Sequence, residues 1–151
     1  MYVSETQVRV RYAETDQMNI VYHGNYAQYF EVGRVEAIRQ LGFSYKDLEG
    51  TGIIMPVIEW TAKFLRPAHY DDLLTVRTTL KDWPVAHRIE FHQEVCNQRG
   101  KLLTTGLVRL YFLIAKTMEK TNMPPEMADR LRPWFTPAAD EGAKPLPLPN
   151  E

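Results

Sequence analysis

The stretch from Tyr12 to Arg34, "YAETDQMNIVYHGNYAQYFEVGR", changes character halfway along, and the rest of the chain is best understood outward from it. It starts with a polar, acidic run that contains Asp16 and then crosses a short apolar step at residues 20–22. From Asn25 onward the apolar side chains return every three or four positions, which is the spacing of an amphipathic helix. The sequence therefore places a carboxylate a few residues before a helix start.

This helix is expected to run from Asn25 to Leu41 and to bury one face. Gly42 follows as a C-terminal cap, because glycine readily adopts the left-handed conformation that ends helices. Glu31 and Arg34, three positions apart, are expected to form an ordinary surface ion pair. The predicted buried face consists of Tyr26, Tyr29, Phe30, Gly33, Ala37, Ile38 and Leu41.

Alternation of apolar and polar side chains predicts strands on both sides of the helix. The first is a half-buried strand over residues 7–12, with Tyr12 on its buried face. Turn signals between the later strands favour an antiparallel meander. A long helix buries its apolar face best on the concave side of such a sheet, so we expect an α+β fold with about five strands wrapped around one central helix. The later strands are predicted at 58–64, 74–80, 89–95 and, continuously apolar and therefore covered on both faces, 102–115.

Length and composition narrow the class of protein. The 151 residues predict one domain over residues 1–136, closing with a short helix in "PPEMADRLRPWF", and a Pro-rich tail over residues 137–151. A net charge of -1 with scattered basic residues argues against nucleic acid or an anionic membrane as a partner. The single cysteine, Cys96, excludes an intramolecular disulfide, and neither a signal peptide nor a membrane-spanning run is visible. We expect a cytoplasmic protein.

Common catalytic motifs are missing from the sequence. It contains no G-x-S-x-G elbow, no Gly-rich phosphate loop, no CxxC pair and no HExxH. His87 and His92 are five positions apart on a predicted strand, so they point to opposite faces and do not chelate one ion. We therefore expect no metal site, and an inert buried thiol at Cys96.

Asp16 allows two interpretations from the residues alone. The run "ETDQMN" is rich in turn formers, and aspartate commonly bonds its own backbone in such turns. Alternatively, the turn folds the carboxylate back toward the start of the helix. Unpaired amides converge there with the positive end of the helix dipole, and they can stabilise an oxyanion. A carboxylate facing the same carbonyl could attack it or deprotonate a water that does.

The residues at the helix start are expected to surround that site. His23 is expected to contribute its backbone N–H rather than its ring, and Gly24 removes bulk so that a ligand can approach. Asn25 either caps the helix or lines the site. Tyr22 and Tyr26 are packing groups whose rings would suit an aryl or medium-length acyl group, although core packing would use them equally well.

Residues 10–38 closely resemble the N-terminal signature of hotdog-fold acyl-CoA thioesterases of the hydroxybenzoyl-CoA thioesterase type. The resemblance covers about residues 5–118, and its later part includes "FLRPAHYDDLLTV" and "GKLLTTGLVRLYFL". In the hotdog fold a sheet wraps one long helix, which agrees with the order of elements derived above. The matching pieces are Asp16, the Val21-Tyr22-His23 step, the Asn25-Tyr26 pair and the Tyr29-Phe30-Glu31…Arg34 helix.

The resemblance implies a thioesterase acting on a coenzyme A thioester, with no further cofactor. It implies that Asp16 is the catalytic carboxylate and that the backbone N–H of His23 polarises the thioester carbonyl. Sites of this family lie between two subunits, which implies at least a homodimer, with tetramers common. The cations of Arg66, His69 and Arg88 are candidates for contacts with the nucleotide phosphates.

Two rival functions stay open. A hotdog hydroxyacyl dehydratase needs a histidine base, but its characteristic His-Phe-Pro-Gly stretch is absent and "YHGNY" lacks the Phe-Pro. A non-catalytic acyl-CoA binding module would keep the fold without turnover. The sequence also leaves open the acyl group, coenzyme A versus acyl carrier protein, the nucleophile or base role of Asp16, and dimer versus tetramer.

Overall fold

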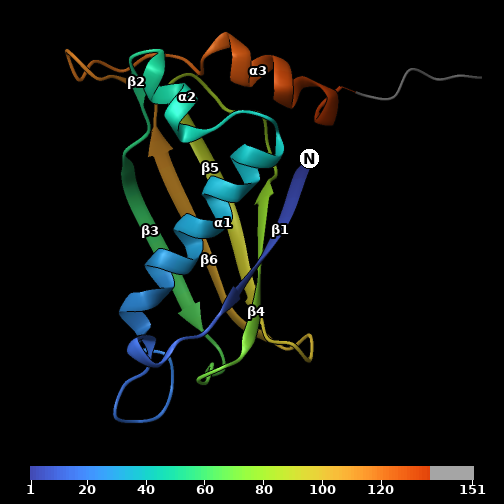
Figure 1. The fold of residues 1–151 in the computed structure, drawn as a ribbon. Coiled ribbons are helices and arrows are strands. Elements are labelled where there is room, and N and C mark those ends of the chain that lie inside the picture. Colours follow the sequence, from blue (N-terminus) through green and yellow to red (C-terminus); the bar gives the residue numbers. More distant parts are fainter. Residues whose placement is uncertain (137–151) are drawn as a thin grey trace, which may run out of the picture.

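The computed structural model describes residues 1–136 and shows a five-stranded antiparallel sheet with one long helix lying diagonally across it (Figure 1). The expected hotdog-type α+β architecture is therefore confirmed, whereas the predicted Pro-rich tail lies outside the described residues. No helix within residues 1–136 is both long enough and apolar enough to cross a bilayer. The elements are β1 (Tyr2–Arg9), α1 (Tyr26–Gln40), α2 (Tyr45–Gly50), β2 (Ile53–Ile54), β3 (Val57–Phe64), β4 (Leu73–Leu80), β5 (Arg88–Cys96), β6 (Leu102–Tyr111), β7 (Leu113–Ile114) and α3 (Pro125–Leu131).

The order of strands in the sheet is β1-β4-β5-β6-β3, so the predicted meander is correct only for β4, β5 and β6. The prediction was wrong for β3, which pairs with β6 at one edge while β1 occupies the place beside β4. The segment 65–72 between β3 and β4 is not a tight turn, and it carries the chain across the ends of the other strands (Figure 1). As a result β3 is an edge strand.

Helix α1 buries the predicted face against the concave side of the sheet. Tyr26, Tyr29, Phe30, Gly33, Ala37 and Ile38 are all buried, and Leu41 is half-buried. Gly42 adopts φ +81°, as expected of a C-terminal glycine. These features follow from local spacing, which explains why the sequence predicted them.

Arg34 corrects one expectation about the helix. It is only 7% exposed, and no ion pair joins it to the exposed Glu31 among the described residues. Burial raises the pKa of the neighbouring Tyr45 hydroxyl, and the Arg34 cation opposes that shift. The curved sheet and the chain after the helix cover a wider arc of α1 than the apolar stripe alone indicates, so Arg34 is enclosed.

Two glycines allow α1 to lie close to the sheet. A Cβ on Gly33 would lie 2.6 Å from Val76 Cγ1, and one on Gly106 would overlap the Phe30 ring and lie 2.7 Å from the Thr61 carbonyl oxygen. Neither distance is tolerated by ordinary Cβ atoms, and the Thr61 carbonyl belongs to a paired strand that cannot shift freely. We infer that glycine at these positions sets the depth at which the helix is buried.

Replacing Gly106 with alanine is expected to reduce the free energy of unfolding by about 2 kcal/mol, because the added methyl overpacks the contact between Phe30 and β6. The control is Gly50→Ala, since a Cβ there meets nothing within 4 Å. Urea unfolding followed by circular dichroism measures both variants. Equal stability of the two would contradict the proposed close packing.

The first and last strands end earlier than predicted. The predicted strand over residues 7–12 begins instead at Tyr2 and ends at Arg9, and Tyr12 is 74% exposed in a 3-10 turn over Tyr12–Glu14. The Val10 N–H still donates to the Asp72 carbonyl just before β4, and the chain turns away after it, where the Glu14 carboxylate accepts from the Arg11 N–H.

The predicted strand over residues 102–115 is split into two. β6 ends at Tyr111, and β7 pairs with β2 in a separate two-stranded sheet. The outward side chains of β6 are half-buried rather than covered, so the prediction that this strand is buried on both faces was also wrong. The short helix predicted near the C-terminus is present as α3, with Pro125 in its first turn.

Candidate active site

The loop between β1 and α1, which contains Asp16 in the sequence, lies at the end of the sheet where α1 begins (Figure 1). Asp16 Oδ1 accepts the Met18 N–H at 2.8 Å, and the Asp16 N–H donates to the Ile20 carbonyl at 2.9 Å. Asn19 completes the tight turn with φ +62°. Asp16 therefore does form the turn expected from its neighbours, but Oδ2 accepts no hydrogen bond from the described residues.

A hollow of about 470 Å³ opens beside this turn. Asp16, His23 and Arg66 are among the residues that line it, and most of the remaining wall is apolar. The carboxylate and the helix start thus share one hollow, as the second interpretation of Asp16 requires. The other lining residues are Met18, Ile20, Val21, Tyr26, Phe64, Leu65 and Pro67.

The helix start offers free backbone donors. A 3-10 turn over His23–Asn25 leads directly into α1, and the Asn25 N–H is taken by the Tyr22 carbonyl at 2.9 Å. The N–H groups of His23 and Gly24 have no backbone acceptor among residues 1–136, as expected at the first positions of a helical segment. Together with the positive end of the α1 dipole, they can stabilise a negatively charged oxygen.

The structure shows additional contacts of three neighbours of the helix start. A Cβ on Gly24 would lie 2.8 Å from the Tyr22 ring, so glycine at this position makes room for that ring, and its role toward a ligand stays a prediction. Tyr22 is half-exposed, packs on the His23 ring at 4.3 Å and does not line the hollow. Asn25 neither caps α1 nor lines the hollow, because its Nδ2 donates to the Glu14 carbonyl at 2.8 Å.

Tyr26 forms part of the wall of the hollow and is almost fully buried. Its ring meets the Phe64 ring edge-on at 5.2 Å, so one residue from α1 and one from β3 join at the floor of the site. Burial raises the pKa of the Tyr26 hydroxyl above its ordinary value, which keeps it neutral at physiological pH. Tyr26 therefore presents an uncharged aromatic surface to the hollow.

Glu14 is the residue near the site that sequence reasoning missed. It is 5% exposed, and its carboxylate accepts the Arg11 N–H at 2.9 Å, the Arg11 guanidinium at 2.9 Å and the Tyr29 hydroxyl at 3.0 Å. Its carbonyl accepts both the Tyr22 N–H at 2.9 Å and the Asn25 side chain. Glu14 thereby fastens the base of the loop that carries Asp16 to the start of α1.

The electrostatics of Glu14 favour the charged form. Burial alone would raise the pKa of the Glu14 carboxyl, but hydrogen bonds from Arg11 and Tyr29 outweigh it, and the pKa lies below its usual range. Burial and the adjacent Glu14 carboxylate together raise the pKa of Tyr29, so its hydroxyl stays protonated and donates. The sequence contains a signal for one of these contacts, because a glutamate three residues after Arg11 marks a capping arrangement. It contains no signal for the buried partner Tyr29.

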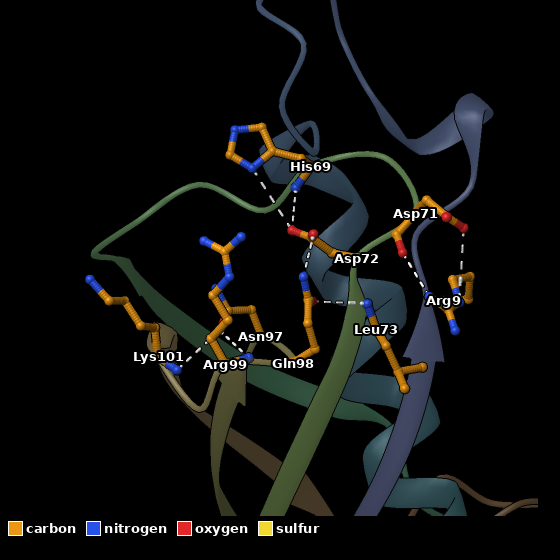
Figure 2. Close-up of polar contacts among 9 residues, drawn as sticks. All are labelled: Arg9, His69, Asp71, Asp72, Leu73, Asn97, Gln98, Arg99 and Lys101. Atoms are coloured by element: carbon orange, nitrogen blue, oxygen red, sulfur yellow. Dashed lines mark hydrogen bonds and ion pairs between the residues drawn. The ribbon is translucent and has the colours of Figure 1, made fainter.

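The three cations expected to meet phosphates are not gathered at one place in the chain. Arg66 lines the hollow, and its Nη1 donates to the Leu102 carbonyl at 3.1 Å. His69 lies on the same loop, where its N–H donates to Asp72 Oδ2 at 2.9 Å (Figure 2). Arg88 starts β5 at the opposite end of the sheet and lies 3.6 Å from Glu90, so within one chain it is remote from Asp16.

No group of three or more candidate metal ligands of the His, Cys, Asp and Glu types comes together within the described residues. His87 lies just before β5 rather than in it, with its ring edge-on to Tyr111 at 4.6 Å. The expected absence of a metal site stays a prediction. Without a metal, Asp16 and the free amides at the start of α1 could both reach a carbonyl group that entered the hollow.

Comparison with known proteins gives consistent matches. A family model described as "Thioesterase-like superfamily" matches residues 10–131. The chain is 46% identical over 102 residues to YneP of Bacillus subtilis, a candidate acyl-CoA thioesterase, covering 68% of this chain and 73% of that protein. Among solved structures, a DHNA-CoA thioesterase from Staphylococcus aureus superposes with a TM-score of 0.77 at 35% identity, covering 89% of this chain and 87% of that chain. A 4-hydroxybenzoyl-CoA thioesterase, at 19% identity and a TM-score of 0.77 over 86% of this chain and 99% of its own, shares the fold.

Proposed function

From the premise that the chain belongs to the thioesterase-like superfamily, we propose that it hydrolyses an acyl-coenzyme A thioester to the free acid and coenzyme A. The relatives named as acyl-CoA or DHNA-CoA thioesterases support the substrate class. The observation that carries the proposal is the shared apolar hollow, in which Asp16 and the start of α1 lie together.

In the proposed reaction the thioester carbonyl oxygen accepts the free amides at His23 and Gly24, which stabilise the oxyanion as it forms. Asp16 acts on the carbonyl carbon in one of two ways. As a nucleophile it forms a mixed anhydride and releases the thiolate, and water then hydrolyses the anhydride. As a base it takes a proton from the attacking water, and the tetrahedral intermediate expels the thiolate.

The acyl group is proposed to occupy the apolar part of the hollow, against Tyr26, Phe64 and Leu65. Phe64 and Leu65 belong to the β3 edge and its end, and both are exposed in the single chain. A second chain on that edge would deepen the hollow and exclude water from the thioester. Electrostatic interactions within the site would become stronger for the same reason.

We propose that the active unit is a homodimer joined through β3. A long apolar edge strand that stays uncovered invites pairing with another chain. A twofold pair of antiparallel edges inverts one sheet relative to the other, so the Arg88 end of one chain would lie beside the hollow of its partner. Assembly of dimers into tetramers and a cytoplasmic location stay predictions. The exposed apolar side chains of the edge are Val57, Ile58, Trp60, Phe64 and Leu65.

Replacing Ile58 with glutamate is expected to convert the protein to monomers at micromolar concentration and to lower turnover, because a charge would then be buried at the β3 edge. The dissociation constant should rise at least about tenfold. Val85→Glu, in the exposed turn before β5, is the matched control. Sedimentation velocity measures the mass, and a wild-type monomer with full turnover would contradict the dimer.

The function itself is tested by measuring thiol release from a panel of alkyl- and aryl-CoA thioesters. Hydrolysis of at least one of them at an enzyme-like rate is the expected result. A hydroxyacyl thioester in the same panel separates the dehydratase alternative, which would give an alkene without free thiol. Tight binding of an unhydrolysable coenzyme A analogue with no turnover of any thioester would instead indicate a binding module.

A further inference from the structure

The hollow is bounded on one side by an aromatic wall, where the start of α1 meets the end of the edge strand β3 (Figure 1). Tyr26 and Phe64 both line the hollow, and their rings meet edge-on at 5.2 Å. The His23 ring lies 6.4 Å from the same Phe64 ring. Because the free amides at the helix start belong to His23 and Gly24, this wall stands close to the expected position of the reacting carbonyl.

The two halves of the wall differ in how firmly they are held. Tyr26 is 2% exposed, and its ring also packs edge-on against Tyr29 at 5.5 Å. Burial raises the pKa of the Tyr26 hydroxyl, and the Thr104 hydroxyl and the Ala68 backbone oppose that shift, so polar groups surround the far end of the ring. Phe64 is 48% exposed on an edge strand. Tyr26 is therefore the fixed half of the wall, and the size of Phe64 decides how far the hollow extends.

The backbone that carries Phe64 is anchored to the neighbouring strand. Phe64 pairs with Thr104 of β6, and the Leu65 N–H donates to the Leu103 carbonyl at 2.7 Å. The Arg66 N–H donates to the same carbonyl at 3.1 Å. A chain that enters the hollow and reaches Phe64 thus meets a ring on a fixed backbone. Shortening this side chain should deepen the hollow without moving the strand.

Beyond Phe64 the face of β3 that looks toward α1 carries a much smaller side chain. Alternate residues of a strand share a face, so Ala62 is the next residue on this side, and it pairs with Gly106 of β6. Two residues of a strand span about 7 Å. The residue after that, Trp60, packs edge-on against Phe30 at 5.9 Å and closes the far end. Phe64 therefore separates the hollow from a stretch of strand that presents only a methyl group.

We propose that Phe64 sets the maximum length of the acyl group, so that the enzyme prefers short linear and single-ring aromatic acyl groups to long-chain ones. The inference rests on the proposed function and deepens it by naming the acyl class. A chain that extends from the start of α1 toward β3 gains apolar contact with Tyr26 until it meets the Phe64 ring. A methylene beyond that point turns out to solvent and adds no burial.

The test measures kcat/KM for linear thioesters from acetyl-CoA to palmitoyl-CoA and for benzoyl-CoA. In the wild type, kcat/KM should rise over the shortest chains and fall for lauroyl- and palmitoyl-CoA. In Phe64→Ala the maximum should move to longer chains, by the number of methylenes that span about 7 Å. Each methylene gained should raise kcat/KM roughly fourfold, because burial of a methylene is favourable to that extent. An unchanged maximum in folded Phe64→Ala, or a wild type that prefers palmitoyl-CoA, would overturn the proposal.

Refilling the space gives a second readout. Adding Ala62→Leu to Phe64→Ala should move the maximum back toward shorter chains, because leucine then occupies the stretch that loss of the ring uncovers. Failure to reverse the shift would overturn the assigned path along β3. If Phe64→Ala does not fold, Phe64→Leu tests the same point, and it should shift the maximum in the same direction by a smaller amount.

Ile114→Ala is the matched control. It removes an apolar side chain that is 37% exposed from β7, and Ile114 does not line the hollow, so the chain-length profile should not change. Leu65→Ala tests the alternative path, because Leu65 lines the hollow just after Phe64. A shift of the maximum in Leu65→Ala rather than in Phe64→Ala would overturn the proposal and direct the acyl chain along the rim.

Failure of the proposed function gives a different pattern. If the wild type hydrolyses no thioester, calorimetry with S-alkyl-coenzyme A thioethers of increasing chain length tests the length limit without any chemistry. Affinity that stops rising at a short chain in the wild type and continues to rise in Phe64→Ala would support the proposal. The same dependence on chain length in both proteins would overturn it.

Discussion

Replacing Asp16 with asparagine lowers kcat for the best acyl-CoA by at least about 100-fold, if Asp16 is the group that acts on the thioester carbonyl. Asparagine keeps an oxygen that can accept the Met18 N–H, so the turn around residue 16 is retained. It removes the negative charge needed for attack or for proton abstraction. Asp16→Ala removes both the charge and the acceptor, and it should lose the same activity with an added loss of stability of about 1 kcal/mol.

Thiol release under steady-state conditions measures both variants, and thermal unfolding shows whether each remains folded. Asp71→Asn is the control, because Asp71 is an exposed loop aspartate that lies beside Arg9 rather than in the hollow. Wild-type turnover in Asp16→Asn would remove the basis of the proposed mechanism. A covalent acyl adduct found by rapid quenching and mass spectrometry would identify Asp16 as nucleophile, and its absence during turnover would favour the base.

The parts of the fold that depend on local periodicity could be predicted from the sequence. The buried face of α1, the cap at Gly42 and the existence of five strands all follow from the spacing of apolar side chains and from turn residues. Asp16 could be placed near the helix start because only a short loop separates them. The resemblance to a known family then supplied the chemistry that spacing alone left open.

What could not be predicted depends on contacts between distant segments. β3 shows the same alternation as a strand inside a meander, and its position beyond β6 is fixed by the sheet as a whole. Asn25 is of a residue type that is common at helix N-caps, yet its side chain donates a hydrogen bond to the carbonyl of Glu14 instead. Arg66 and His69 lie on one loop, but Arg88 comes from the opposite end of the sheet, and spacing along the chain does not indicate that separation.

Glu14 shows the same limitation and leads to the second large effect. Its carboxylate accepts hydrogen bonds from Arg11 and from Tyr29, which lies fifteen positions later on α1. No local pattern indicates the contact between Glu14 and Tyr29. Glu14→Ala leaves the buried Tyr29 hydroxyl without its acceptor and frees the base of the Asp16 loop. We expect a loss of about 2 kcal/mol of stability and a fall in kcat, because Asp16 is then poorly positioned.

The pH dependence of stability gives an independent test of Glu14. Its pKa in the folded state is depressed, so its contribution to stability is fully present above the ordinary glutamate pKa of about 4.3. That contribution is lost as the pH falls through the lower folded-state value. Glu14→Gln lacks the titrating group, so its stability should decline less steeply than that of the wild type over this acidic range.

Urea unfolding between neutral pH and the acid range measures this difference, and Glu126→Gln, in the exposed first turn of α3, serves as the control for removing one carboxylate. A structural role alone would lower stability without changing the chemistry once the protein is folded. A positioning role lowers kcat in fully folded Glu14→Gln while leaving KM nearly unchanged. If folded Glu14→Gln retained wild-type kcat, Glu14 would stabilise the loop without positioning Asp16 for the reaction.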